Sequence, residues 1–304
     1  MLYLGVDGGG TKTRLLVLSH TGTVIAATSA GPLNQYTVGL SAAVANLACA
    51  ISSLPAPIAA AAIGNPALDD SPDDPARDAF LAALRETHVL PETTPIYMKS
   101  DVFMALYALT AGAPGVLVIA GTGSMSAAFD RTGALHVAGG WGHPTADPGS
   151  AYDIASRALS YVFDASDGIE ASPALTAVAL SHFNVNSPRS LIAILNDPAC
   201  TKDAVAAFAK DVDALAADGD PHACHVLDTA ADSLIRYAAA LRRKVGEDCP
   251  VGLYGGVFQH STRVRERFTQ RFVELYPNSP AAPLTTPPEM GAARYAMNKS
   301  QEEY

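Results

Sequence analysis

The sequence predicts an α/β protein of two lobes built from duplicated domains, and three observations lead to this prediction. Residues 6–18, VDGGGTKTRLLVL, place a glycine- and threonine-rich turn between two apolar segments. Residues 115–139, GVLVIAGTGSMSAAFDRTGALHVAG, repeat the order of strand, Gly/Thr turn and strand. Elsewhere, short apolar segments alternate with helical patterns, as expected for an α/β fold.

The first glycine-rich turn fits neither of two common nucleotide-binding loops. A Walker loop needs four residues between its first glycine and a Gly-Lys-Ser/Thr, and the sequence contains no such string. A dinucleotide-binding loop needs a helix after its glycines. The residues after Gly10 are short, β-branched and apolar instead, and predict a second strand over Thr11–Leu18. The glycines therefore form a hairpin turn, whose N–H groups can surround an anion; an ordinary hairpin turn is the alternative.

The second copy of this pattern strengthens the anion-binding interpretation. An apolar strand, Val116–Ala120, leads into Gly121-Thr122-Gly123-Ser124, and a second strand follows over Met125–Phe129. Internal similarity on this scale suggests two related domains, each opening with a phosphate-type hairpin. Two such hairpins facing one another would hold the phosphates of a nucleotide in a cleft.

Composition excludes several classes of protein. The 304 residues are 49% hydrophobic and 16% charged, enough for one large or two medium domains. A net charge of −10 without a Lys/Arg cluster argues against a nucleic-acid partner. The longest apolar tract, Val38–Ile63, is interrupted by prolines and is unlike a membrane span. The four cysteines are far apart in the sequence, which fits a reduced, cytoplasmic setting and argues against metal ligation by thiolates.

The expected elements of the first domain follow the first hairpin. Residues 66–75 contain prolines and four aspartates, with a fifth at Asp78, and this pattern predicts a mobile, solvated loop rather than a metal site. Gly112-Ala113-Pro114-Gly115 is the candidate hinge, giving domains over 1–113 and 114–287. The remaining elements are a strand over 23–28, a helix over 41–53, a strand over 59–64, a helix over 75–87, a strand over 95–99 and a helix from Asp101.

The second domain is expected to be mainly helical after its first strands. Its expected elements are helices over 150–163, 172–183, 203–217 and 222–245, a strand over 251–254 and a helix over 261–276. After this domain, a final helix is expected over 288–297.

The chain resembles the N-acetylglucosamine kinase family in Asp7–Thr13, in Gly121–Ser124, and in Gly139–His143 with Asp147 and Gly149-Ser150. Glucosamine kinases are relatives, as are the activator ATPases of 2-hydroxyacyl-CoA dehydratases and benzoyl-CoA reductases (the BadF/BadG/BcrA/BcrD type). The resemblance covers about residues 3–297. It implies the actin-like (ribonuclease H-like) sugar kinase and ATPase fold, with duplicated domains around a nucleotide cleft. By the same analogy, a final helix over 288–304 folds back on the first domain.

The nucleotide would be ATP, held with Mg²⁺. Asp7 ends the first strand just before the phosphate turn, where a carboxylate can ligate magnesium; the alternative is an aspartate that only initiates the turn. Gly255-Gly256, between a strand and a helix, resembles the adenosine-binding turn. The residues expected to bind the nucleotide are Gly9, Gly10, Thr11, Thr13, Gly121, Thr122, Gly123, Gly255 and Gly256.

Asp101 stands at a strand-to-helix junction, where the resembled kinases place an aspartate that acts as general base. That base takes the proton from the sugar hydroxyl as the hydroxyl attacks the γ-phosphate. The alternative interpretation is a helix N-cap, a position that aspartate fills well.

The sugar site is expected near this base. Asn34 matches the substrate-binding asparagine of the family. Trp141, the only tryptophan, can stack on a sugar face, although a plain core aromatic is an equal alternative. Asp147 would accept hydrogen bonds from ring hydroxyls, or cap the helix that starts at Ser150. The full set of expected sugar-binding residues is Asn34, Gln35, Asp101, Gly140, Trp141, Gly142 and Asp147.

One residue departs from the family pattern. Many relatives have Glu, or sometimes Gln, after the aspartate that corresponds to Asp147, whereas this chain has Pro148. Proline offers no side-chain hydrogen bond, so the choice between free and N-acetylated amino sugars stays open.

The resemblance implies phosphorylation of N-acetylglucosamine or glucosamine at the 6-hydroxyl, by a cytoplasmic homodimer with no nucleic-acid or membrane partner. An activator ATPase with an iron–sulfur cluster is one alternative, but it needs clustered thiolates. A sugar-sensing protein that has lost catalysis is the other.

Overall fold

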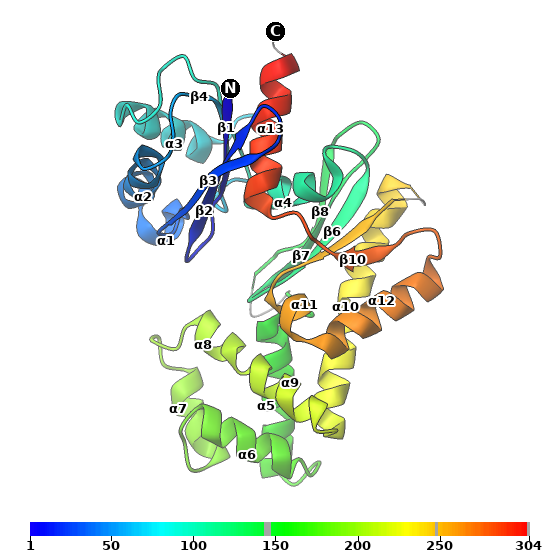
Figure 1. Cartoon of the computed structure of the whole chain (residues 1–304). Helices are drawn as coiled ribbons and strands as arrows, with labels where there is room; N and C mark the ends of the chain where they lie inside the picture. The colour runs from blue at the N-terminus through cyan, green and yellow to red at the C-terminus, as the bar shows by residue number, and fades with distance from the viewer. Residues whose placement is uncertain (143–146, 247–248, 303–304) are drawn as a thin grey trace. The chain divides into compact units, whose positions relative to one another are not determined.

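The computed structural model describes residues 1–142, 147–246 and 249–302 and divides into two compact units (Figure 1). The first unit comprises residues 1–113 and the chain from Leu284 onward, and the second comprises residues 114–283. Each unit contains a five-stranded mixed sheet with helices, so the α/β class is confirmed. His143, part of a segment that carries the family resemblance, lies outside the described residues.

The first sheet has the strand order β3-β2-β1-β4-β5. The strands β1, β2 and β3 form an antiparallel meander, whereas β4 and β5 continue the sheet parallel to β1. The elements of the first unit are β1 Leu2–Asp7, β2 Thr13–Ser19, β3 Val24–Ala30, α1 Gln35–Val38, α2 Leu40–Ser52, β4 Ile58–Gly64, α3 Pro75–Glu86, β5 Ile96–Lys99, α4 Asp101–Thr110 and α13 Pro288–Glu302.

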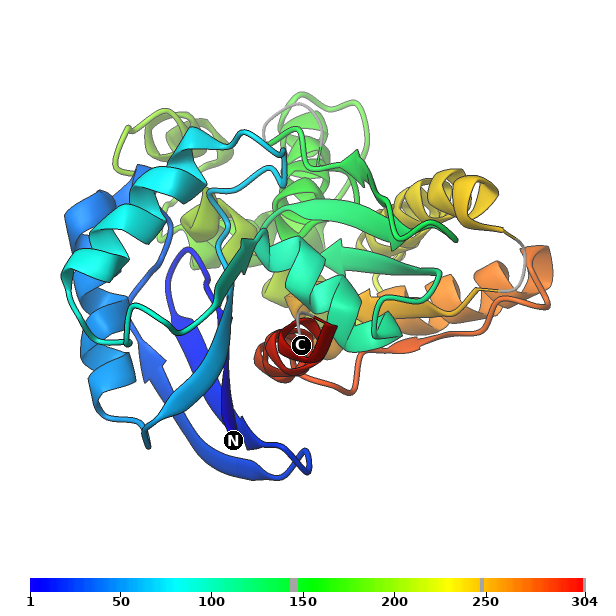
Figure 2. The same cartoon turned by 90° about the horizontal axis from the view of Figure 1, so that it is seen from above.

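Helices cover both faces of this sheet, with α2 and α3 on one face and α4 and α13 on the other (Figures 1 and 2). The alternation of side chains along β2 supplies both interfaces. Leu15 and Val17 pack in the core with α2 and α3, whereas Leu16 and Leu18 pack against Ala293 of α13.

The last helix approaches β1 so closely that only glycine fits at Gly5. A Cβ there would overlap the backbone of Glu289 and Ala293. Since α13 begins beside β1, it brings the carboxylate of Glu289 near the end of that strand, where Asp7 lies.

The second sheet has the order β10-β9-β6-β7-β8, which repeats the first. Again three strands form an antiparallel meander and two continue parallel to the first of them. The elements are β6 Gly115–Ala120, β7 Ser124–Phe129, β8 Leu135–Gly139, α5 Ala151–Ser166, α6 Pro173–His182, a 3-10 turn Pro188–Ser190, α7 Leu191–Leu195, α8 Lys202–Ala207, α9 Ala209–Ala217, α10 Pro221–Val245, β9 Val251–Tyr254, α11 Gly256–His260, α12 Thr262–Leu275 and β10 Ala281–Pro283.

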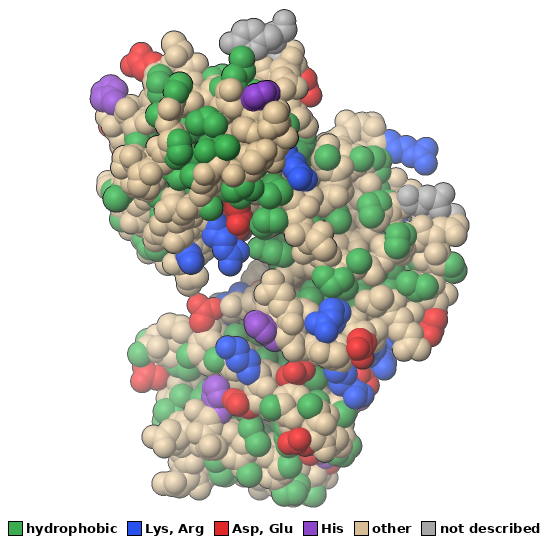
Figure 3. All heavy atoms as spheres, in the orientation of Figure 1, with side chains coloured by type: hydrophobic (Ala, Val, Ile, Leu, Met, Phe, Trp, Pro, Cys, Tyr) green, Lys and Arg blue, Asp and Glu red, His purple; other side chains and the backbone are tan. Residues whose placement is uncertain are grey.

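The helix α10 packs along this sheet and also against α12. Asp228 and Asp232 of α10 form ion pairs with Arg263, Arg267 and Arg271 of α12. Figure 3 shows acidic and basic side chains side by side on this unit. The paired side chains are partly exposed to solvent, so we assign the α10–α12 contact mainly to apolar packing.

Two expectations differ from the structure. The single helix expected over 203–217 is two helices, α8 and α9, which meet at the fully buried Phe208. The loop over 66–75 is not simply solvated: Asp74 is buried and caps α3, and the carboxylate of Asp70 accepts a hydrogen bond from the N–H of Ser100 at 2.8 Å. Aspartates that cap helices and tie loops give the same sequence pattern as solvated ones.

None of the helices in the described ranges is long and apolar enough to cross a bilayer.

Candidate active site

Two aspartates flank Gly64 at one edge of the first sheet. Asp7 ends β1 and pairs with Gly64 at the end of β4, which in turn pairs with Lys99 at the end of β5. Asp101 follows two residues later as the first residue of α4. A Cβ at Gly64 would lie 3.2 Å from the Cα of Asp101, so glycine allows this close approach. The carboxyl ends of parallel strands are the usual place for ligands in α/β sheets.

Burial raises the pKa of both carboxyl groups. The pKa of Asp7 rises to about 7, first by desolvation and then by the negative charges of Asp101 and Glu289, while Arg14 opposes the rise. Desolvation raises the pKa of Asp101 to about 6, and a backbone hydrogen bond from Val102 at 2.8 Å limits the effect. Neighbouring carboxyl groups with raised pKa values are typical of functional sites.

The N-cap of α4 is Ser100, so the interpretation of Asp101 as the cap is wrong. The hydroxyl oxygen of Ser100 accepts from the N–H of Phe103 at 3.0 Å. Asp70 in turn accepts from both the N–H and the hydroxyl of Ser100. The carboxylate of Asp101 is therefore not needed to start the helix, and Asp70 and Ser100 fix the backbone from which it projects.

The first glycine turn is tied to the sheet edge beside these aspartates. The N–H of Gly8 donates to the carbonyl of Gly64 at 2.9 Å, and the carbonyl of Gly9 accepts from Leu33 at 3.0 Å. A Cβ at Gly10 would meet no atom within 4 Å, so this part of the turn has open space in front of it.

The two threonines of this turn differ in their availability to a ligand. Thr11 is exposed and is available to a phosphate, as expected from the sequence. Thr13 is fully buried, and its hydroxyl donates to the carbonyl of Gly31 at 2.7 Å. The side chain of Thr13 is therefore committed to the fold and would act on a phosphate only by holding the turn.

The second glycine turn presents donors rather than acceptors. The carbonyls of Gly121 and Thr122 accept from the N–H groups of Ala151 and Tyr152, at 2.9 and 3.3 Å, where α5 begins. The N–H groups of Thr122 and Gly123 have no acceptor in the part of the chain that the structure describes. Because its carbonyls are engaged and its N–H groups are not, this turn is suited to an anion.

The amides expected to bind sugar in the first unit are already partly engaged. The amide oxygen of Asn34 accepts from the N–H of Tyr36 at 3.0 Å and caps the short helix α1. The amide nitrogen of Gln35 donates to the carbonyl of Ala76 at 3.2 Å. The amide oxygen of Gln35 is buried and has no partner among the described residues, so it can accept from a ligand.

In the second unit, two of the alternative interpretations are wrong. Trp141 is 82% exposed and is therefore not a core aromatic. Asp147 does not cap α5, because Ser150 fills that position. Asp147 is instead buried, and its carboxylate accepts from the N–H of Gly142 and pairs with Lys202, each at 3.2 Å.

Gly255 has a packing reason in addition to any contact with a nucleotide. Its φ is +104°, and a Cβ would overlap the carbonyl of Ala120 at the end of β6. Gly256 begins α11, and a Cβ there would make only an ordinary contact with His260. The pair of glycines alone therefore does not establish an adenosine site.

Glu289 is a component of the first unit's site that sequence reasoning missed. One of its carboxylate oxygens is buried and has no partner within the described ranges, and its charge raises the pKa of Asp7. Glu289 is far from Asp7 in the sequence, and no motif surrounds it.

The environment of Asp7 fits a magnesium ion, whose preferred ligands are oxygens. Asp7 is partly buried, its charge is disfavoured by two carboxylates, and a bound cation would reverse that penalty. No group of three or more metal-ligating side chains occurs among the described residues. Protein ligands alone would not complete the coordination shell, as is usual for magnesium held together with phosphate and water.

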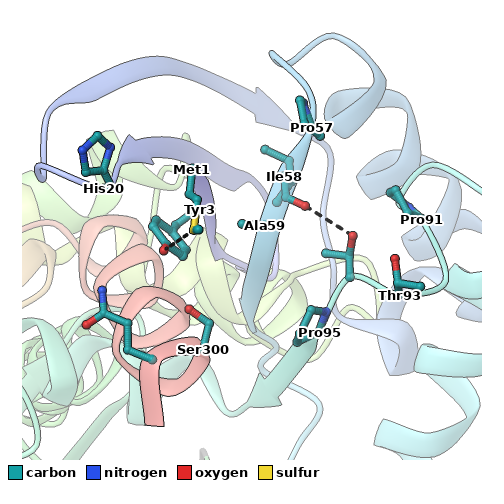
Figure 4. Close-up of a pocket in the computed structure, with 12 residues that line it drawn as sticks. Met1, Tyr3, His20, Pro57, Ile58, Ala59, Pro91, Thr93, Pro95 and Ser300 are labelled. Carbon is teal, nitrogen blue, oxygen red and sulfur yellow. Dashed lines mark hydrogen bonds between the residues drawn. The ribbon is translucent and has the colours of Figure 1, made fainter. Parts of the chain in front are cut away.

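A hollow of about 1140 Å³ in the first unit lies away from these aspartates (Figure 4). Its lining includes Met1, Ile58 and Pro95, at or next to the amino ends of β1, β4 and β5. Asp7 and Asp101 lie at the opposite, carboxyl ends of these strands. None of the described residues that line the hollow is acidic, so the hollow lacks the carboxylates that mark the candidate site.

Residues 4–296 match the BadF/BadG/BcrA/BcrD ATPase family. The chain belongs to this family. Membership in an ATPase family supports the use of ATP, and it confirms the resemblance found in the sequence.

Two relatives extend along most of the chain. It is 28% identical over 315 residues to an N-acetyl-D-glucosamine kinase of Dictyostelium discoideum, with 99% of each chain covered. It is also 28% identical over 254 residues to a glucosamine kinase of Vibrio cholerae, with 81% of this chain and 82% of the relative covered.

Solved structures show the same fold. A candidate N-acetylglucosamine kinase from Chromobacterium violaceum has a TM-score of 0.76 at 25% identity, covering 97% of this chain and 98% of that one. A ROK family glucokinase from Streptomyces griseus, solved with glucose and AMPPNP, has a TM-score of 0.60 at 15% identity, with 99% and 100% covered. The expected sugar kinase and ATPase fold is therefore confirmed.

The raised pKa of Asp101 predicts a pH-dependent gain of stability in Asp101→Asn. The pKa is about 6 in the folded chain and 3.8 when unperturbed, so ionisation of this group opposes folding at high pH. The variant should melt above the wild type at about pH 8, and the gain should shrink as the pH falls from about 6 to about 4, below which the group is protonated in both states. Thermal unfolding across this range measures it. The exposed Asp73→Asn is the control, and equal shifts in both variants at every pH would contradict the prediction.

Proposed function

We propose that the protein transfers the terminal phosphoryl group of ATP to the 6-hydroxyl of an amino sugar, N-acetylglucosamine or glucosamine. The observation that carries this proposal is the pair of partly buried carboxyl groups, Asp7 and Asp101, at the carboxyl edge of the first sheet. Asp7 suits a cation and Asp101 suits a proton. Phosphoryl transfer to an alcohol requires a bound cation and a group that accepts the proton of the alcohol. The amino-sugar kinases among the relatives support the substrate class.

Asp101 is the proposed general base. Its pKa of about 6 leaves the carboxylate ionised near neutrality and makes it a better proton acceptor than an ordinary aspartate. As the sugar 6-oxygen attacks the γ-phosphorus, its proton passes to the carboxylate of Asp101. The bond from the γ-phosphorus to the β–γ bridging oxygen breaks, and ADP leaves.

The proposed role of the glycine turns is to bind the nucleotide's phosphates. The N–H groups of Thr122 and Gly123 would donate to phosphate oxygens, and the turn over Gly9–Thr11 would do the same in the first unit. Asp7 would hold Mg²⁺, which neutralises negative charge on the phosphates when bound. Gly255-Gly256 are proposed to lie against the adenosine.

The proposed sugar contacts are the residues that the family resemblance implies. Asn34 and Gln35 would hydrogen-bond the ring substituents, with the unpartnered amide oxygen of Gln35 as an acceptor. The exposed indole of Trp141 would stack on the sugar face, with Gly140 and Gly142 allowing backbone approach. The carboxylate of Asp147 already accepts two hydrogen bonds. Asp147 remains a proposed sugar ligand through the lone pairs that these two bonds leave free.

The structure does not favour an activator ATPase. In the described ranges the cysteines form no disulfide, and no thiolate-containing cluster of metal-ligating groups is present. We place the protein in the cytoplasm because its thiols suit a reducing compartment. The homodimer remains a prediction from the resemblance.

Asp101→Asn tests the proposed base. The amide cannot accept the proton, so kcat should fall by about 10² or more while the KM for the sugar stays within a few-fold of the wild type. An assay of ADP release with N-acetylglucosamine and with glucosamine measures both constants. Asp73→Asn is the matched control for loss of one surface carboxylate. Turnover near that of the wild type in Asp101→Asn would reject the assignment.

The turns are tested best at glycines where added bulk meets no protein atom. Cβ atoms at Gly10 and Gly121 would meet nothing within 4 Å, unlike those at Gly9 and Gly123. Gly10→Val and Gly121→Val should therefore fold normally but fill the space in front of the turns, weakening Mg·ATP binding by about tenfold or more, the loss of one good contact. Calorimetry measures the affinity, and Ala134→Val in an exposed turn is the control. Unchanged affinity in both glycine variants would refute the phosphate-binding role.

A further inference from the structure

An ion pair stands against the second glycine turn. The ammonium nitrogen of Lys202 lies 3.2 Å from Oδ2 of Asp147. The side chain of Asp147 is 6% exposed and that of Lys202 is 28% exposed, so the carboxylate is buried while part of the lysine remains accessible. No sequence motif singles out Lys202, which is 55 residues from Asp147.

This pair touches the turn at Gly123. A Cβ built on Gly123 would lie 2.7 Å from Oδ2 of Asp147 and 3.0 Å from the ammonium nitrogen of Lys202. The ammonium therefore lies directly beside the backbone whose N–H groups, at Thr122 and Gly123, have no acceptor among the described residues. Two free N–H groups and one ammonium group are therefore gathered at one place, beside the carboxylate of Asp147.

The position of Lys202 is built into the core of the second unit. Lys202 is the first residue of α8, which Thr201 caps by accepting from the N–H of Ala204 at 3.2 Å. Val205 of α8 and the following Phe208 are buried in the main core of this unit. The same helix packs against α5, whose first N–H groups engage the carbonyls of the turn. The lysine and the turn are therefore held by the same scaffold.

We propose that Lys202 binds a phosphate of the nucleotide held on the turn Gly121–Gly123, and that Asp147 positions its ammonium there. An ammonium has three donors, and Asp147 takes one of them, so two remain for phosphate oxygens. Lysine is a common phosphate ligand that acts as a point charge. This inference rests on the proposed function, because it requires a nucleotide at this turn.

An ion pair with only a structural role would give a different result when Lys202 is replaced. If Lys202 only neutralises the buried Asp147, its loss lowers stability but does not discriminate between ligands with and without phosphate. If it binds phosphate, its loss weakens ATP binding and leaves adenosine binding unchanged.

The experiment compares Lys202→Met with the wild type by calorimetry, using Mg·ATP and adenosine as ligands. Loss of a charge-assisted contact should raise the Kd for Mg·ATP by about tenfold or more. The Kd for adenosine should stay within about twofold of the wild-type value. Lys202→Arg should restore part of the affinity. Lys210→Met, at an exposed lysine on the neighbouring α9, is the matched control and should bind like the wild type.

A double variant keeps the test valid if Lys202→Met unfolds. Removing the lysine leaves the buried carboxylate unpaired, so Asp147→Asn combined with Lys202→Met removes both charges and should remain folded. Equal Mg·ATP affinity in this double variant and in Asp147→Asn alone would overturn the proposal, as would an equal loss of adenosine affinity. Failure of the wild type to bind Mg·ATP would reject the proposed function itself, whereas a normal wild type with an unaffected lysine variant rejects only this inference.

Discussion

The candidate site depends on one constraint: two carboxyl groups share a poorly solvated edge of the first sheet. Asp7 and Asp101 lie there because β1, β4 and β5 are parallel and because Gly64, between them, carries no side chain. Burial raises both pKa values, and the charge of Asp101 raises the pKa of Asp7 further. The fold therefore makes the ionised form of these groups unfavourable, and binding of a cation or a proton reduces that cost. That is an energetic cost to the free protein and an advantage for phosphoryl transfer.

The duplicated sheet provides the anion-binding geometry in a repeated form. In both units an antiparallel hairpin opens the sheet, and its turn is anchored through backbone hydrogen bonds. The anchors differ, since the first turn is tied to β4 and the second to the start of α5. In the second unit this anchoring occupies the carbonyls of Gly121 and Thr122, which leaves N–H donors available. The ion pair of Asp147 and Lys202 then adds a positive charge at the same turn.

The sequence was sufficient for features that depend on local pattern. The glycine turns, the strands around them and Asp101 at its junction follow from periodicity and residue type over short stretches. Lys202 and Glu289 could not be found this way, because each reaches its site from a helix distant in the sequence. The burial of Thr13 was missed for a related reason. Its hydroxyl donates a hydrogen bond to the carbonyl of Gly31, which lies just after β3. Local patterns identify the turn, and tertiary contacts decide which side chains remain available.

The most direct test of the account is the identity of the product. Purified protein, Mg·ATP and either N-acetylglucosamine or glucosamine should yield ADP and one new phosphomonoester, and phosphorus NMR should show its phosphorus coupled to the protons of C6. The corresponding 6-deoxy sugars should yield no phosphosugar, because they lack the accepting hydroxyl. Release of inorganic phosphate without any phosphosugar, or a phosphate on another carbon, would contradict the account.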